Sequence, residues 1–377
     1  MSFRRLRAVA HKEFLHIVRD TRSLIAALAI PIFLLLLFGY ALTLDVDRIP
    51  TYVFDQDQTP QSREALERFR GSRYFTLLGS VDDYGQLERG IDRSTILLGV
   101  VIPRGFGRDL EMGRSAEVQL LVDGSDSNTA SLALGYAEGL LQAYALEVRL
   151  EAQNRKGAPK VQLPVEPRIR VWYNEDLKSR NYIVPGIIAV ILMIISALMT
   201  SLTIAREWEN GTMEQLLSTP VRPTELLLGK LSAFFAVGVA DVLITLLVGV
   251  GIFHVPLRGN VLLLFGTSCV FLFGALCWGI FLSAATRSQL LAYQASVISS
   301  FLPAFLLSGF VFSIENMPRV IQAITYVVPA RYFVSFLKGV FLKGVGLEVL
   351  WWEVLLLVVY SAVLFGMAAR TMRQKVA

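Results

Sequence analysis

Cysteine, histidine and charged side chains are all scarce in this chain. Its 377 residues include two cysteines, three histidines and only 18% charged residues. Cys269 and Cys277 lie in one apolar run, about 12 Å apart along a helix, which is too far for a disulfide. His11, His16 and His254 lie at segment ends without metal-ligand spacing. This distribution favours structural or solvated roles over ligation.

Motifs for enzymatic chemistry are also missing. No GxxxxGK[ST] phosphate loop is present, so the chain should not hydrolyse ATP unaided. Region 45–180 has no histidine and therefore cannot supply a Ser-His-Asp catalytic triad. The segment DQDQTP around Asp55 and Asp57 fits a turn with a helix cap better than a catalytic pair of carboxylates. A membrane-embedded hydrolase would need a catalytic constellation, and none can be assembled from these residues.

The basic balance of the chain does not indicate nucleic acid. The pI is near 9.2, but residues 45–180 hold 18 of the 36 Lys and Arg and 21 of the 31 Asp and Glu. The positive excess therefore belongs to the rest of the chain, mostly beside the ends of apolar runs. That pattern is typical of membrane topology and predicts no nucleic-acid partner.

Long apolar runs are abundant and set the fold class. The chain is 54% hydrophobic with a mean hydropathy of +0.53, and a bilayer core needs roughly 20 apolar residues per helix. We predict an integral membrane α-helical protein with six transmembrane helices. The runs are Ser23–Leu44, Tyr182–Ile204, Leu231–Phe253, Val261–Ala285, Leu290–Phe312 and Trp351–Ala369.

Charge beside these runs predicts the topology. Residues 1–22 have the pattern of a basic amphipathic helix that lies on the anionic inner leaflet. Their bases place the N-terminus in the cytoplasm. A cleaved signal peptide is the competing interpretation. Alternation then places the loop 205–230 and the C-terminal tail, 371–377, inside, and residues 45–180 outside. The outer segment with Arg319, Arg331, Lys338 and Lys343 fits this scheme least well.

Residues 45–180 read as an inserted extracytoplasmic α/β domain. Strands are expected at Thr51–Phe54, Ile96–Ile102, Val118–Val122 and Arg168–Tyr173, and helices at Ser62–Arg70, Tyr84–Arg93 and Thr129–Gln153.

Two features of the membrane region 181–370 stand apart from its spans. Segment 313–345 is divided by Pro318 and Pro329, which predicts a re-entrant pair of helices or a hairpin resting on the interface. Asp241 is the one acid placed deep in a span, where it either serves the substrate path or hydrogen-bonds a neighbouring helix.

The polar segment AREWENGTMEQLLSTPVRPTELLLGK, 205–230, separates two spans and interleaves acids with bases. Thr212 and Thr219 fit caps or turns, and Pro220 with Pro223 must end any helix that begins near Thr212. The segment predicts a short surface helix, Met213–Ser218, through which a soluble motor could act; an ordinary connecting loop is the alternative.

This segment resembles the signature of permease subunits in the type-two class of ABC exporters. The matching elements are Arg206-Glu207, Gly211-Thr212, Glu214-Gln215-Leu216, Thr219-Pro220 and Gly229-Lys230. The segment with Pro318, Pro329 and Tyr332 resembles the family's re-entrant helices, and the large insertion after the first span resembles its multidrug-efflux-like branch. The resemblance covers essentially the whole chain.

The resemblance implies a bacterial inner-membrane permease that forms half of an export pathway for drugs, lipids or another amphipathic substrate. It implies a second permease copy or paralogue, a separate ATPase subunit that carries ATP and Mg, and docking of a periplasmic membrane-fusion adaptor on residues 45–180. No cofactor is expected in this chain. Residues 1–22 would be the connecting helix, 23–44 the first span and 206–219 the coupling helix.

The residues implied for the ATPase contact are Arg206, Glu207, Glu209, Gly211, Thr212, Met213 and Glu214. Asp241, Pro329 and Tyr332 are candidates for the substrate path. A non-transporting membrane sensor or assembly factor with a ligand-binding outer domain is the alternative function.

Overall fold

The computed structural model describes residues 2–41, 47–155, 172–174 and 178–376. The chain forms two compact units. One comprises Met1–Thr43 with Val171–Ala377 and contains the apolar helices, and the other is Leu44–Arg170. Each is described by itself.

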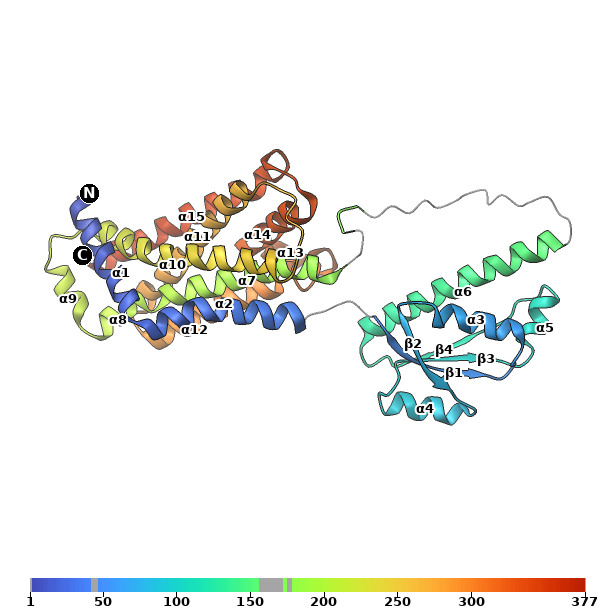
Figure 1. The fold of residues 1–377 in the computed structure, drawn as a ribbon. Coiled ribbons are helices and arrows are strands. Elements are labelled where there is room, and N and C mark those ends of the chain that lie inside the picture. The colour runs from blue at the N-terminus through green and yellow to red at the C-terminus, as the bar shows by residue number, and fades with distance from the viewer. Residues whose placement is uncertain (1, 42–46, 156–171, 175–177, 377) are drawn as a thin grey trace. The chain divides into compact units, whose positions relative to one another are not determined.

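Six helices of the first unit are long and apolar enough to cross a membrane, counted over the described residues. They are α2 (Thr21–Ala41), α7 (Ser179–Ser201), α10 (Pro223–Gly251), α11 (Val261–Thr286), α12 (Gln289–Leu306) and α15 (Leu347–Val376). These six candidate spans agree with the predicted number, and they run along one another in the first unit (Figure 1).

Two span boundaries differ from the prediction, each for a local reason. Helix α10 begins eight residues before Leu231, because Pro223 suits a first helical turn and the Glu225 carboxylate accepts a hydrogen bond from the N–H of Arg222. Helix α12 ends at Leu306 rather than at Phe312, because the chain turns at Gly309 with a φ of +76°.

Helix α7 is the central element of this unit and is buried over most of its length. It packs against α2, α10, α11, α12 and α14 (Pro329–Lys338). Its approach to α11 is close, because a Cβ on Gly279 would lie 2.2 Å from the carbonyl oxygen of Ala197. The Thr200 hydroxyl donates to the Leu276 carbonyl across the same interface at 2.9 Å.

The segment before the last span folds as short pieces. After a single 3-10 turn, Ile314–Asn316, come α13 (Arg319–Thr325) and α14, which are bent by 82° relative to each other, and a π-helical turn, Gly339–Lys343. The two short helices expected from the proline positions are therefore present. They lie at the end of the unit opposite to α1 (Phe3–Arg19) (Figure 1).

The second unit is a three-layer α/β fold. Its strands are β1 (Ile49–Asp55), β2 (Phe75–Ser80), β3 (Leu98–Ile102) and β4 (Gln119–Val122), in the order β2-β1-β3-β4. Strand β1 pairs in parallel with β2 and β3, and β4 is antiparallel to β3. Helices α3 (Pro60–Arg70) and α6 (Ser127–Arg155) lie on one face and α4 (Tyr84–Asp92) on the other, with α5 (Phe106–Glu111) after β3 (Figure 1).

Most predicted elements of this unit are observed. Strand β2 was not predicted, since FTLLGS shows no clear alternation of apolar and polar residues. Of the strand expected at 168–173, residues 168–171 lie outside the described residues, and Trp172 and Tyr173 are not in a strand. The Asp55-Asp57 turn is confirmed: the Asp55 carboxylate accepts the N–H of Asp57, and the Asp57 carboxylate accepts those of Gly105 and Gly107.

Candidate functional site

The polar segment after α7 folds as two short helices, α8 (Thr203–Glu209) and α9 (Thr212–Leu217). The Ser283 hydroxyl of α11 accepts the N–H groups of Ile204 and Ala205 at 3.0 and 2.9 Å, so α8 is tied to the membrane helices where it begins. The turn between the two helices uses Gly211 at a φ of +71°, a conformation that favours glycine. The single helix predicted at 213–218 is therefore the second of a pair.

The structure places the predicted contact residues in three different environments. Glu209, Gly211, Thr212 and Glu214 are exposed. Met213 is only 1% exposed and belongs to the main hydrophobic core. Arg206 and Glu207 line a cavity, and the exposed Thr212 also borders it.

Glu207 takes part in a buried ion cluster that joins three helices. The Lys230 ammonium of α10 donates to Glu13 Oε1 of α1 at 2.9 Å and to Glu207 Oε1 of α8 at 2.7 Å. Lys12 lies 3.5 Å from Glu13 and 3.7 Å from Glu207. Lys230 is 1% exposed and Glu13 is 5% exposed, so these charges are stabilised by one another rather than by water. The ion cluster is Lys12, Glu13, Glu207 and Lys230.

Burial and charge act in opposite directions on Glu13. Burial alone would raise the pKa of its carboxyl, but the Lys230 ammonium and its hydrogen bond, helped by Lys12, lower the pKa below its ordinary value. Glu13 is therefore charged at neutral pH, and α1 is held to α8 and α10 by paired charges.

Sequence reasoning included Lys230 in the polar segment but missed Glu13. A signal was available, because Glu13 falls on the helical stripe Leu6, Ala10 and Ile17 that packs inward. An acid within an apolar stripe needs a buried partner.

Helix α1 packs along the start of α10. A Cβ on Gly229 would lie 2.6 Å from Val9 Cγ1, so the glycine allows the two helices to touch. Glu225 is fully buried and accepts the N–H of Ser2 at 2.6 Å, and Arg5 lies 3.4 Å from its carboxylate. The predicted amphipathic helix thus has its inward face on the protein itself.

Helix α8 is also tied to the turn between α11 and α12. Glu209 Oε1 accepts the N–H of Gln289 at 2.8 Å, and the Arg287 guanidinium lies 4.3 Å from the centre of the Trp208 ring. The hydrogen bonds from Gln289 lower the pKa of the exposed Glu209 carboxyl. Together with the ion cluster, these contacts fix α8 to four separate helices.

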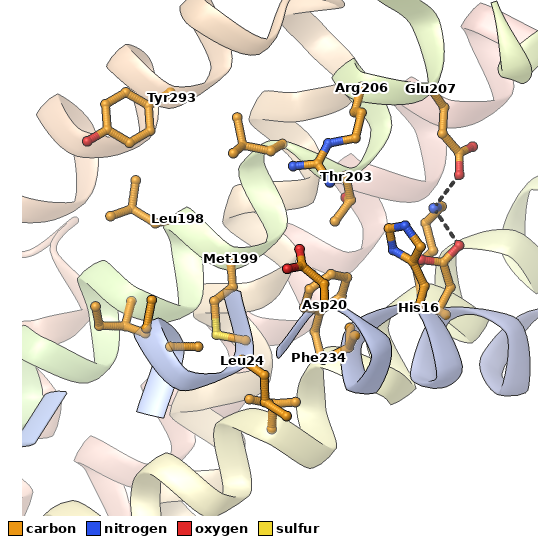
Figure 2. Close-up of a pocket in the computed structure, with 18 of the residues that line it drawn as sticks. His16, Asp20, Leu24, Leu198, Met199, Thr203, Arg206, Glu207, Phe234 and Tyr293 are labelled. Carbon is orange, nitrogen blue, oxygen red and sulfur yellow. Dashed lines mark hydrogen bonds and ion pairs between the residues drawn. The ribbon is translucent and has the colours of Figure 1, made fainter. Parts of the chain in front are cut away.

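A cavity of about 540 Å³ opens beside the ion cluster. Its walls come from α1, α2, α7, α8 and α10, with Thr212 of α9 at its edge and Tyr293 of α12 at one side (Figure 2). Leu24, Leu198 and Met199 line its apolar part. Arg206 and the ion cluster line the opposite, charged part.

The remaining predicted site residues lie apart from this cavity. Asp241, on α10, is 2% exposed, and its Oδ1 has no hydrogen-bond partner among the described residues. Pro329 is buried at the start of α14, and the Tyr332 hydroxyl donates to the Tyr326 carbonyl at 2.7 Å. Asp241 lies on α10, which packs on α1, α2, α7, α11 and α15. Pro329 and Tyr332 lie on α14, which packs on α7, α11, α12 and α15, so the three predicted path residues lie on helices with different sets of neighbours.

Comparison with known proteins adds a family to this geometry. Residues 22–370 match the model of the ABC-2 family transporter protein. The probable multidrug ABC transporter permease YbhS of Escherichia coli is 39% identical over 366 residues, which cover 97% of this chain and 95% of the relative. The probable multidrug ABC transporter permease YbhR is 31% identical over 99% of this chain and 100% of its own length. The inner membrane transport permease YhhJ of the same species is 26% identical over 87% of this chain and 86% of its own length.

Proposed function

This chain belongs to the ABC-2 family of transporter proteins, and from that premise we propose that it is the export permease of an ATP-driven pump whose ATPase is a separate subunit. The chain would form half of the membrane pathway, and a second copy or a paralogue would form the other half. We further propose that it exports an amphipathic substrate, because YbhS and YbhR, which match this chain over nearly their whole length, are named probable multidrug ABC transporter permeases.

The observation that carries the proposal is that α8 is attached to the membrane helices through several contacts while neighbouring residues of α8 and α9 are exposed. Helix α8 is held by the ion cluster, by Ser283 and by Gln289, while Glu209, Gly211, Thr212 and Glu214 remain exposed. Because α8 is held by several contacts, a subunit docked on its exposed residues can transmit its movement to the membrane helices as a rigid-body tilt. A loosely attached loop would absorb that movement.

We therefore assign the ATPase contact to Glu209, Gly211, Thr212 and Glu214, which are exposed around the turn between α8 and α9. Glu207 and Met213 would act as positioning residues, since one is held in the ion cluster and the other in the core.

The distribution of bases supports cytoplasmic termini. Helix α1, with its many arginines, lies at the same end of the membrane unit as α8, α9 and the end of α15 (Figure 1). Arg222, Arg287 and Arg370 belong to the same group of helix ends. We propose that this end faces the cytoplasm of a bacterial inner membrane and that the α/β unit lies outside, where a periplasmic adaptor would dock.

The test is how much of a co-expressed ABC ATPase subunit co-purifies with the permease. We expect Glu214→Lys to reduce ATPase co-purification by at least tenfold, because it reverses a charge in the exposed contact. Glu315→Lys, the same change on an exposed residue at the opposite end of the unit, should leave the yield unchanged. Equal yields for the two variants, or ATP hydrolysis by the purified permease alone, would refute the proposal.

A further inference from the structure

The cavity beside α8 has two parts of different chemistry, one apolar and one charged. Its apolar wall on α7 runs from Ile195 to Leu202, about 10 Å along the helix axis. Phe234 and Ile30 complete this part from α10 and α2. The volume of about 540 Å³ falls within the range of pockets for drug-sized ligands.

The acids at the charged end are already engaged. Glu13 and Glu207 share the Lys230 ammonium, with Lys12 close to both. Asp20 also has an interaction of its own. An entering cation would have to break one of these interactions to reach a carboxylate.

Arg206 differs from these groups. It is exposed, and none of the described residues pairs with its guanidinium. Figure 2 shows its side chain directed into the cavity, near the boundary between the charged and the apolar parts. A guanidinium binds carboxylate or phosphate oxygens through two parallel hydrogen bonds.

We propose that this cavity binds a single-chain amphiphile with an anionic carboxylate or phosphate head group. The head group lies on Arg206, and the tail lies between α2, α7 and α10. The limited volume favours one tail over the two chains of a membrane phospholipid.

The position of the cavity suggests a consequence for transport, and this part rests on the proposed function. The ion cluster that positions α8 is also a wall of the cavity. A bound amphiphile would therefore contact the same helix that carries the ATPase surface, so occupancy should change the rate of ATP hydrolysis by the assembled pump.

Binding is tested with the purified permease in phosphatidylcholine nanodiscs and a fluorescent fatty acid, 11-(dansylamino)undecanoic acid, beside its methyl ester. We expect the acid to bind at least tenfold more tightly than the ester, equal to about 1.4 kcal/mol. Arg206→Gln should remove this difference. Arg4→Gln, the same change at an exposed arginine outside the cavity, should preserve it.

A second variant locates the tail. Met199 lines the apolar part, so Met199→Trp should fill it and weaken both acid and ester. Equal affinities for acid and ester in the unmodified chain, or unchanged discrimination in Arg206→Gln, would overturn the anionic site. Displacement of the acid by phosphatidylglycerol added to the nanodiscs would overturn the single-chain assignment. None of these readouts involves the ATPase, so failure of this site is distinct from failure of the proposed function.

Discussion

Removal of the Lys230 ammonium should be among the most damaging single changes at this end of the protein. Lys230→Met keeps most of the length of the side chain but leaves Glu13 and Glu207 near each other with only the more distant, half-solvated Lys12 for compensation. Breaking a buried pair by removing one partner costs about 3–5 kcal/mol, since the remaining charge stays buried. We expect a loss of this size, together with release of α1 from α8.

The effect is measured by denaturant unfolding of the purified permease in detergent, and α1 release by proteolysis near residue 12. Lys343→Met, the same change at an exposed lysine, should cost less than about 0.5 kcal/mol. Combining Lys230→Met with Glu13→Gln and Glu207→Gln should recover most of the lost stability, because neutral amides no longer need a cation.

Acidification offers an independent check on the same ion cluster. The folded-state pKa of Glu13 lies below its unfolded value, so its stabilising contribution is present above the ordinary value of 4.5 and is lost as the pH falls through the lower folded-state pKa. Glu13→Gln should weaken this acid-induced loss. A Lys230→Met variant as stable as the Lys343→Met control, with no gain from the two glutamine substitutions, would refute the reasoning.

Two further predictions concern the turn and the buried acid. Gly211→Ala should destabilise the turn between α8 and α9 by about 1–2 kcal/mol, because a Cβ is strained at a φ of +71°. Gly211→Asn should be tolerated better than Gly211→Ala. The measurement is the amount of ATPase that co-purifies with each variant. Equal losses of ATPase in both variants would exclude backbone strain as the cause. Asp241→Asn should preserve or raise the melting temperature, because it removes an ionisable group buried in a span. Export assays then decide its role: altered export would place Asp241 on the substrate path, and unchanged export would leave it a packing residue.

Local patterns explain why much of the fold was predictable. Apolar runs long enough for a bilayer predict the spans, and alternation with turn residues predicts three of the four strands of the α/β unit. Strand β2 lacked such a pattern, because its last four residues are exposed or half-buried rather than alternating. The boundaries of α10 and α12 depended on a capping interaction and on a glycine turn, which short-range hydropathy does not register.

Side-chain direction within the polar segment was not predictable to the same degree. Arg206, Glu207, Met213 and Glu214 belong to one short motif but have different surroundings. Arg206 and Glu207 line the cavity, and only Glu207 of these two is ion-paired; Met213 is in the core, and Glu214 is exposed on the protein surface. These differences follow from the break at Gly211 and from the position of α1, which is separated from the motif by about 200 residues of sequence.

The amino-acid sequence alone is enough to place this chain among the multi-pass membrane permeases of the ABC-2 family, because both the spans and the family motifs consist of contiguous residues. The three-dimensional fold was needed to show that Glu13 of α1 and Glu207 of α8 share the Lys230 ammonium of α10, and that Arg206 lines a cavity beside them. This follows because a charged side chain that is buried away from water needs an oppositely charged partner close to it in the fold, and that partner can be distant in sequence.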